Sequence, residues 1–360
     1  MSDTPTDAAV TPAATPAVTP ADTARVEKEA AGGRRAEPGG LVRLLRSGGG
    51  HNLGLVLALA LLALVGVVSG GERFASVDNV MTILRLAAVI GVVSIGMTFV
   101  ITGGGIDLSV GALVALSSVW CTTLSTQAMA NDYHWIFIVT TALLVGAGAG
   151  LINGLLVAYG GVVPFIATLA MMASARGLAE IISARKTQIV SVPGFTDALS
   201  RDVLGISLLI WIFVIVAVIG WVVLNRTTFG RRTLAIGGNP EASRLAGINV
   251  RRHTVLLYVL VGLCCGIAAV MLVARTTTGS ATHGQLYELE AIAAVVIGGT
   301  LLSGGRGTIV GTVFGVLIFA TLTNVFVINN LSISAQAFVK GLIIVAAVLL
   351  QKRFARRPGS

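Results

Sequence analysis

Charged side chains are scarce in this chain of 360 residues. Asp, Glu, Lys and Arg together make up 11% of the sequence and aromatic residues 6%, whereas hydrophobic residues make up 55%. The mean hydropathy is +0.89. A soluble domain of this length needs a far more polar composition, so a soluble protein is excluded. The sequence therefore predicts an all-α integral membrane protein.

Sequence signatures of catalysis and of metal binding are also missing. The chain contains no GxxxxGK[ST] loop, no HExxH pair and no nucleophile elbow. Cys121, Cys264 and Cys265 fall within apolar runs and lack the spacing of metal ligands. We expect them to be buried thiols, because adjacent cysteines rarely form a disulfide with each other. We predict that the chain is not an enzyme and carries no metal or cofactor of its own.

Apolar runs recur along the chain, and a helix needs roughly 20 apolar residues to cross a membrane. On this basis we expect helices at approximately 52–70, 79–101, 109–130, 135–158, 163–183, 204–224, 253–274, 289–303, 308–328 and 334–351. The eighth is short and rich in glycine. The prediction is about ten transmembrane helices with short broken or re-entrant segments.

The charges between these runs predict the orientation of the chain. With the N-terminus inside, the cytoplasmic segments hold Arg34, Arg35, Arg43, Arg46, the loop 225–252, Arg306, Lys352, Arg353, Arg356 and Arg357. The opposite segments hold Glu72, Asp78, Asp132, Asp197, Asp202 and Glu288, with Arg185, Lys186 and Arg201 as exceptions. Because short cytoplasmic loops are enriched in Lys and Arg, both termini are predicted to be cytoplasmic.

The composition changes at both ends of the chain. Residues 1–40 are rich in Ala, Thr and Pro, and such a segment cannot bury enough apolar surface to fold, so we predict a disordered cytoplasmic tail. Residues 41–352 form the predicted transmembrane domain, and 353–360 form a basic tail. The net charge of +9 is spread over short loops and tails, which indicates topology and anionic-lipid contacts rather than nucleic-acid binding.

The loop 225–252 is polar and carries six arginines against one acid. A short helix is predicted inside it. Asn239 suits the capping position, Pro240 the first helical position, and Glu241 the positive end of the helix.

An apolar stripe follows on the same short helix. Ala242, Leu245 and Ala246 share one face, and Gly247 is typical of a helix end. A helix of two turns is not stable alone, so we expect it to dock on a partner. An ordinary basic cytoplasmic loop explains the arginines equally well.

Two glycine-rich segments interrupt the apolar runs. In 102–111, three consecutive glycines would unwind a helix end and place Asp107 and Ser109 at the start of the next helix. Asp107 then either caps amides at the membrane surface or belongs to non-helical backbone that lines a cavity. The segment 298–307 has a similar composition, which suggests a remnant of an internal duplication.

Few charges lie within the predicted spans. Glu288 and Glu290 open the eighth span and either line an external mouth or cap the helix. Arg176 and Glu180 lie four residues apart and are able to pair, and Lys340 is able to reach outward to the membrane surface. Small-residue packing ridges are predicted at Gly146, Gly150 and Gly154, and again at Gly307, Gly311 and Gly315.

Three motifs, taken in order, resemble a known family. They are GMTFVI at 96–101 leading to GGIDLSVG at 104–111, AIGGNPEA at 235–242 with RLAGI at 244–248, and YELEAIAAVVIGGT at 287–300. The chain is similar over roughly residues 50–352 to the membrane subunits of bacterial sugar ABC importers of the ribose, xylose, arabinose and galactose type.

The resemblance implies a permease of the bacterial inner membrane that forms a homodimer with a second copy and works by alternating access. It implies a cytoplasmic ATP-binding subunit, which would hold ATP and Mg, and an extracytoplasmic sugar-binding protein. The loop 225–252 would present a coupling helix to the ATPase. Its implied contact residues are Arg231, Arg232, Gly237, Gly238, Asn239, Ala242, Arg244, Leu245 and Gly247.

The candidates for the substrate pathway are Asp107, Ser109, Asn153, Thr168 and Glu290. Asn153 equally suits an interhelical hydrogen bond. The chain departs from the family at Gly103, where threonine is frequent, and at Glu290, where aspartate is common, so the identity of the sugar does not carry over. An ion-coupled secondary transporter is the alternative, although the spans lack a dense chain of titratable groups.

Overall fold

The computed structural model describes residues 48–355, which are mostly helical. The long helices are α3 (Gly48–Gly70), α5 (Val77–Thr102), α8 (Ile136–Ala158), α9 (Pro164–Ser183), α11 (Leu208–Arg226), α14 (Val250–Thr276), α16 (Ile309–Ile328) and α17 (Ile333–Ala355). The shorter helices are α4 (Glu72–Ala75), α6 (Val110–Cys121), α7 (Leu124–Asp132), α10 (Pro193–Leu199), α12 (Thr228–Gly238), α13 (Pro240–Leu245) and α15 (Tyr287–Ile297). The predicted tail 1–40 and most of the tail 353–360 lie outside the described residues.

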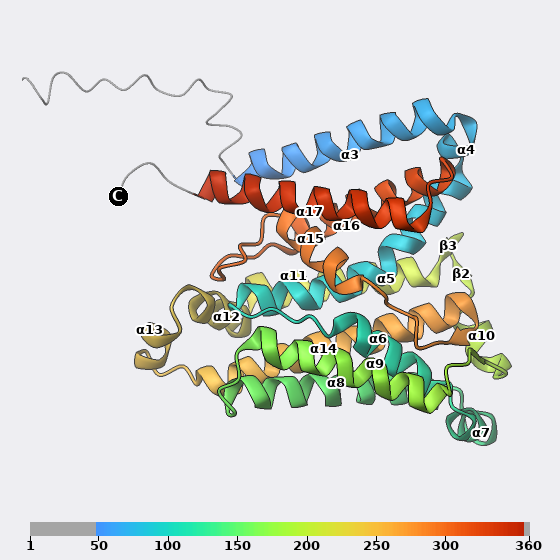
Figure 1. The fold of residues 1–360 in the computed structure, drawn as a ribbon, viewed down its shortest axis with the longest axis horizontal. Coiled ribbons are helices and arrows are strands. Elements are labelled where there is room, and N and C mark those ends of the chain that lie inside the picture. The colour runs from blue at the N-terminus through green and yellow to red at the C-terminus, as the bar shows by residue number, and fades with distance from the viewer. Residues whose placement is uncertain (1–47, 356–360) are drawn as a thin grey trace, which may run out of the picture. The chain divides into compact units, whose positions relative to one another are not determined.

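The prediction of an all-α membrane protein is confirmed. Within the described part of the chain, seven helices are long and apolar enough to cross a membrane. The remaining three predicted spans correspond to α6, α15 and α17. The long helices lie roughly parallel or antiparallel to one another in one bundle (Figure 1).

The predicted helix 109–130 is wrong, because the chain breaks it at Thr122 and Thr123. Thr122 Oγ1 donates to the carbonyl of Ser118 at 2.8 Å, and Thr123 caps the next helix by accepting from the amide of Thr126. Threonine side chains that bond the local backbone compete with helix continuation in this way. The result is the short α6 followed by α7.

The predicted helix 289–303 is also wrong at its end. α15 stops at Ile297, because Gly298 is followed by Gly299 with a φ of 90°. A positive φ ends a helix and favours glycine.

A non-helical segment precedes each of the two short membrane helices. After α5 ends, residues 103–109 run back into the bundle before α6 begins, and a second irregular segment, 280–286, precedes α15 (Figure 1). The order long helix, non-helical segment, short helix, long helix, long helix thus occurs twice, in opposite directions, with α7 added in the first half. This arrangement is typical of inverted repeats in transporters.

The repeat does not match the predicted duplication. The segment 102–111 precedes a short helix, whereas 298–307 follows one. The two glycine segments nevertheless meet in space, where the amide of Gly305 donates to the carbonyl of Thr102 at 2.9 Å.

α14 lies in the core of the bundle and packs along α8 and α5. A Cβ at Gly146 would lie 2.3 Å from the carbonyl oxygen of Gly262, and one at Gly150 would lie 2.2 Å from that of Tyr258. The predicted packing ridge on α8 is therefore confirmed. The second ridge is confirmed at Gly311 and Gly315, which pack on the backbone of Gly298 and Ala294.

Short strands lie at the end of the bundle opposite α13 (Figure 1). β1 (Gln188–Ile189) pairs with β4 (Thr278–Gly279), and β2 (Asp202–Val203) pairs with β3 (Ile206–Ser207), in both cases antiparallel. The β2–β3 turn consists of Leu204 and Gly205, both with positive φ, as a two-residue hairpin turn requires. The prediction that the sixth helix begins at 204 is therefore wrong.

Candidate functional site

The polar loop 225–252 folds into two helices joined by one residue. Thr227 caps α12 by accepting from the amide of Gly230 at 3.3 Å. Asn239 ends α12 and begins α13, since its Oδ1 accepts from the amide of Ala242 at 2.9 Å. Gly247, with a φ of 82°, follows the last turn. The cap and the stop were predicted from sequence, whereas α12 was missed because its three glycines weaken the helical pattern.

α13 presents its apolar stripe outward. Leu245 is 75% exposed, and Ala242 and Ala246 are exposed beside it. Ser243 is the buried residue of this helix, and its hydroxyl donates to the carbonyl of Asn239 at 2.9 Å. None of the described residues covers the stripe, so it is available to another protein.

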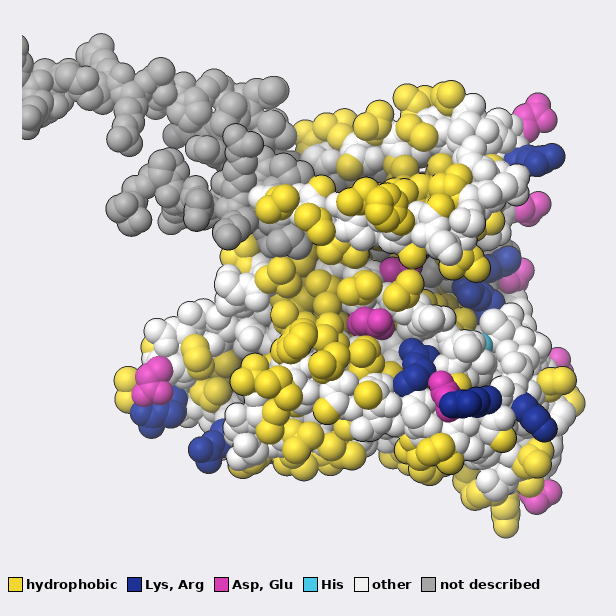
Figure 2. Space-filling model, viewed as in Figure 1, with side chains coloured by type: hydrophobic (Ala, Val, Ile, Leu, Met, Phe, Trp, Pro, Cys, Tyr) yellow, Lys and Arg dark blue, Asp and Glu magenta, His cyan; other side chains and the backbone are white. Residues whose placement is uncertain are grey.

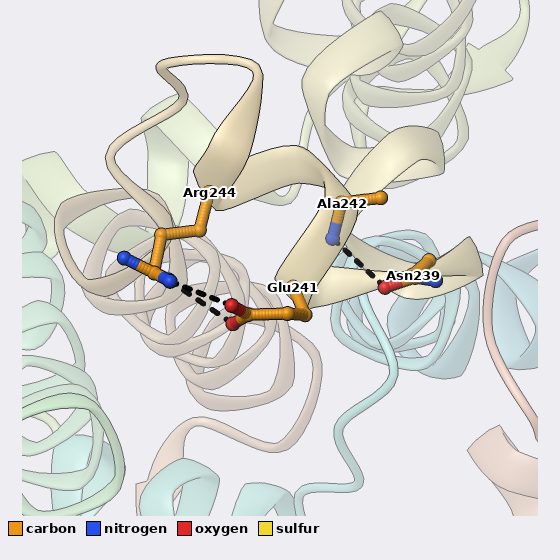
Figure 3. A network of polar contacts seen from close by, with 4 residues as sticks. All are labelled: Asn239, Glu241, Ala242 and Arg244. Carbon is orange, nitrogen blue, oxygen red and sulfur yellow. Dashed lines mark hydrogen bonds and ion pairs between the residues drawn. The ribbon is translucent and has the colours of Figure 1, made fainter. Parts of the chain in front are cut away.

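A charged pair lies on the same exposed helix. Arg244 Nη2 and Glu241 Oε1 are 2.6 Å apart, and Figure 3 shows this pair beside the Asn239 cap. The hydrogen bond from Arg244 lowers the pKa of Glu241 below its usual value. Arg231 and Arg232 of α12 are also exposed. Because both members of the pair are solvated, its contribution to stability is small.

The end of α12 packs against the rest of the bundle through direct backbone contacts, with no side chains between them. A Cβ at Gly237 would lie 1.8 Å from the carbonyl oxygen of Thr102 and 2.5 Å from the amide nitrogen of Gly305. A Cβ at Gly304 would lie 2.7 Å from the carbonyl oxygen of Gly237. We call residues 102–104, 237–238 and 304–307 the glycine junction. Gly238 differs from its neighbour, because a Cβ there would meet nothing within 4 Å.

A cavity of about 460 Å³ adjoins this junction. Its walls include Gly105 and Tyr258 on the bundle side and Ile236 and Pro240 on the α12–α13 side. The hydroxyl of Tyr258 donates to the carbonyl of Ile106 at 3.4 Å, so the cavity reaches the non-helical segment 103–109.

Four predicted pathway residues lie around that segment. Ser109 donates to Asp107 Oδ1 from both its amide, at 2.8 Å, and its hydroxyl, at 2.5 Å. Asn153 Nδ2 of α8 donates to Ser109 Oγ at 2.9 Å, and Thr168 Oγ1 of α9 lies 3.5 Å from the carbonyl oxygen of Ile106. Asp107, Ser109, Asn153 and Thr168 are all fully buried.

Asp107 is buried and bonds its local backbone. Its side chain is 0% exposed and accepts from the amide of Ser109 at 2.8 Å. Both interpretations of Asp107 stay predictions. Asp107 Oδ2 and Asn153 Oδ1 have no hydrogen-bond partner among the described residues. The interhelical hydrogen bond considered for Asn153 is present through Ser109.

Glu290 lies apart from this cluster. Lys340 Nζ of α17 and Glu290 Oε1 of α15 are 2.5 Å apart, and their side chains are 14% and 21% exposed. Lys340 therefore does not reach outward as predicted, because the carboxylate of α15 lies within its reach. Neither Glu288 nor Glu290 caps α15, since no side chain caps that helix.

Arg176 is a charged residue whose contacts were not predicted. It donates to the carbonyls of Ala281 and His283 in the irregular segment 280–286 before α15. Its predicted partner Glu180 instead pairs with Arg185 at 2.9 Å. Figure 2 shows isolated acidic side chains within a largely hydrophobic face of the bundle. Charges in such a setting are rare unless they serve packing or transport, and the position of Arg176 inside a span was the only signal for it in the sequence.

The family model described as branched-chain amino acid transport system / permease component matches residues 79–348. The chain belongs to this permease family.

Among relatives, the permease is 42% identical over 305 residues to the ribose import permease protein of Bacillus subtilis, covering 84% of this chain and 93% of that protein. It is 38% identical over 304 residues to the ribose import permease protein of Escherichia coli K12, and the match covers 82% of this chain and 92% of that protein. It is 37% identical over 288 residues to the L-arabinose transport system permease protein of the same strain, covering 78% and 84%. No solved structure matches the permease. The resemblance to sugar importers that the three motifs carried is thus confirmed.

Proposed function

We propose that this permease is the membrane subunit of an ATP-driven, binding-protein-dependent importer of a monosaccharide, a pentose such as ribose or xylose or a related sugar. The names of its relatives support the sugar class. The observation that carries the proposal is the capped helix α13 with its exposed Leu245, which suits a groove on a separate ATPase.

Three partners complete the transporter. A cytoplasmic subunit binds ATP and Mg and receives α13, with Arg231, Arg232, Gly237, Gly238, Asn239, Ala242, Arg244, Leu245 and Gly247 as the coupling residues. An extracytoplasmic protein delivers the sugar, and a second permease copy forms a homodimer. Both termini and α13 face the cytoplasm of the bacterial inner membrane, in line with the six arginines of the loop.

The permease works by alternating access. Closure of the ATPase dimer moves α13, and the two permease copies rotate as rigid bodies to expose the pathway to one side and then to the other. The pathway follows the segment 103–109, where Asp107, Ser109, Asn153 and Thr168 become accessible in the open states. Glu290 of α15 contributes from the second half. Because the binding protein selects the sugar, weak polar contacts along the pathway are sufficient.

The test is the energy source of uptake. Cells that express the permease with its ATPase and binding protein are given labelled pentoses and hexoses. We expect mutation of the catalytic glutamate of the ATPase to abolish uptake, while a protonophore spares the initial rate when ATP is preserved. Uptake that collapses with the proton gradient and ignores the ATPase mutation would instead establish a secondary carrier.

A further inference from the structure

We infer that the glycine junction is the mechanical link between the coupling helix and the substrate pathway, and that its stiffness depends on the missing side chains of Gly237 and Gly307. This inference rests on the proposed function and adds the route by which movement of α13 reaches the residues of the pathway.

The first step is the contact between α12 and α5. The backbone of Gly237 lies so close to the carbonyl of Thr102 that a Cβ would overlap it at 1.8 Å. Flexible side chains do not separate these two helix ends. Backbone in direct contact has no rotamer to change, so a displacement of one helix end is passed on rather than absorbed.

The second step is the loop that clamps this contact. The amide of Gly305 donates to the carbonyl of Thr102 at 2.9 Å, while Gly304 and Gly305 pack on the backbone of Gly237 and Gly238. A Cβ at Gly307 would lie 1.9 Å from Thr102 Oγ1. Residues 304–307 thus hold the ends of α5 and α12 together.

The third step is the continuity of the chain from the junction to the pathway. Thr102 is separated from Asp107 by four residues, of which three are glycines. Gly103, Gly104 and Gly105 border the cavity of about 460 Å³ together with Ile236 and Gly237 of α12. The start of the segment 103–109 therefore has both a backbone contact with α12 at the junction and open space beside it, so it is able to follow a movement of α12 without repacking the core.

The test uses the full transporter, reconstituted with its ATPase and its binding protein and supplied with D-ribose, D-xylose and L-arabinose. Gly307→Ala is the main variant, because Gly307 lies outside the proposed ATPase contact. Its matched control is Gly177→Ala, at a helical glycine whose Cβ would meet nothing within 4 Å. Three quantities are measured: the co-purification of the ATPase, the sugar imported per ATP hydrolysed, and the stimulation of ATP hydrolysis by the sugar-loaded binding protein.

We expect Gly307→Ala to retain the ATPase but to lose at least about fivefold in sugar imported per ATP, within the usual range of coupling between sites. The double variant Gly307→Ala/Thr102→Ala should recover, because the hydroxyl that obstructs the new methyl group is removed. Gly237→Ala should show the same loss of sugar imported per ATP, and Gly177→Ala should resemble the wild type.

Three results would overturn the inference: normal coupling in Gly307→Ala, equal loss in Gly177→Ala, or no recovery in the double variant. If Gly307→Ala is not recovered from membranes, the double variant still decides, because relief of the overlap must restore both assembly and coupling. A wild-type transporter that imports none of the three sugars and shows no stimulated hydrolysis would contradict the proposed function itself. Normal transport with unaltered coupling in the variants contradicts only the role of the glycine junction and leaves the proposed function intact.

Discussion

Lys340 and Glu290 join α17 to α15 through a largely buried ion pair, with Nζ and Oε1 2.5 Å apart. Sequence alone placed the two residues in separate roles, because their pairing is set by the packing of two helices that brings together residues 50 apart in the chain. A carboxylate in this position tolerates burial only while its partner is present.

Removal of the lysine should therefore destabilise the protein. We expect Lys340→Met to lower the free energy of unfolding by about 1–3 kcal/mol, less than for a fully buried pair because both side chains keep some exposure. Thermal unfolding in detergent measures the effect. In the double variant Lys340→Met/Glu290→Gln most of the stability should return, and an unaltered melting temperature in the single variant would show that the pair contributes nothing.

Leu245 is the second residue whose substitution is informative. Because it is 75% exposed, Leu245→Asp should leave folding and membrane insertion intact while placing a charge in the proposed ATPase groove. We expect sugar uptake to fall by at least about tenfold, since an unpaired buried charge at an interface costs several kcal/mol. Normal uptake in this variant would show that α13 is not the contact through which the ATPase drives transport. Leu204→Asp, at an exposed position on the opposite end of the bundle, is the control.

At the scale of elements, α8 and α14 make the most extensive helix–helix contact in the described part of the bundle. A Cβ at Gly150 would lie 2.2 Å from the carbonyl oxygen of Tyr258, whereas one at Gly148 would meet nothing. Gly150→Ala should lower the free energy of unfolding by about 1–3 kcal/mol through overpacking, while Gly148→Ala should be neutral or slightly stabilising. Thermal unfolding of both variants in detergent measures this. Equal stability of the two would mean that the helices separate easily.

The sequence predicted those elements whose signals are local. Long apolar runs, the Asn239 cap and the glycine ridge of α8 all follow from neighbouring residues, and the structure confirms them. Contacts set by distant residues were not predictable. The pairing of β1 with β4 and the meeting of the two glycine segments both depend on chain partners far away in sequence.

The same distinction between local and distant contacts applies to the candidate site. Asp107 and Ser109 lie two residues apart and were both placed at the start of the same helix, where Ser109 donates to the Asp107 carboxylate. Asn153 and Thr168 were predicted only as individual polar residues in apolar spans, and the fold brings them to the same segment. The contacts of Arg176 with two backbone carbonyls have no signature in the sequence, because a carbonyl carries no residue identity.

At the scale of the whole molecule, orientation is the property to test. Cys121, Cys264 and Cys265 are buried, so cysteines introduced elsewhere will dominate the labelling. In spheroplasts, we expect a membrane-impermeant maleimide to label Leu204→Cys and to leave Leu245→Cys unlabelled until the membrane is opened. The reverse pattern would place α13 outside and exclude its contact with a cytoplasmic ATPase.

The packing of α8 against α14 also has a consequence for the order of events during membrane insertion. The glycine face of α8 is filled by residues of α14, and α14 begins only at Val250, long after α8 has left the ribosome at Ala158. During that interval α14 is not yet there to fill the groove on α8, and lipid or a helper protein must occupy it instead. A ribosome stalled between these two helices would therefore leave an N-terminal half in the membrane that has its spans but not its core.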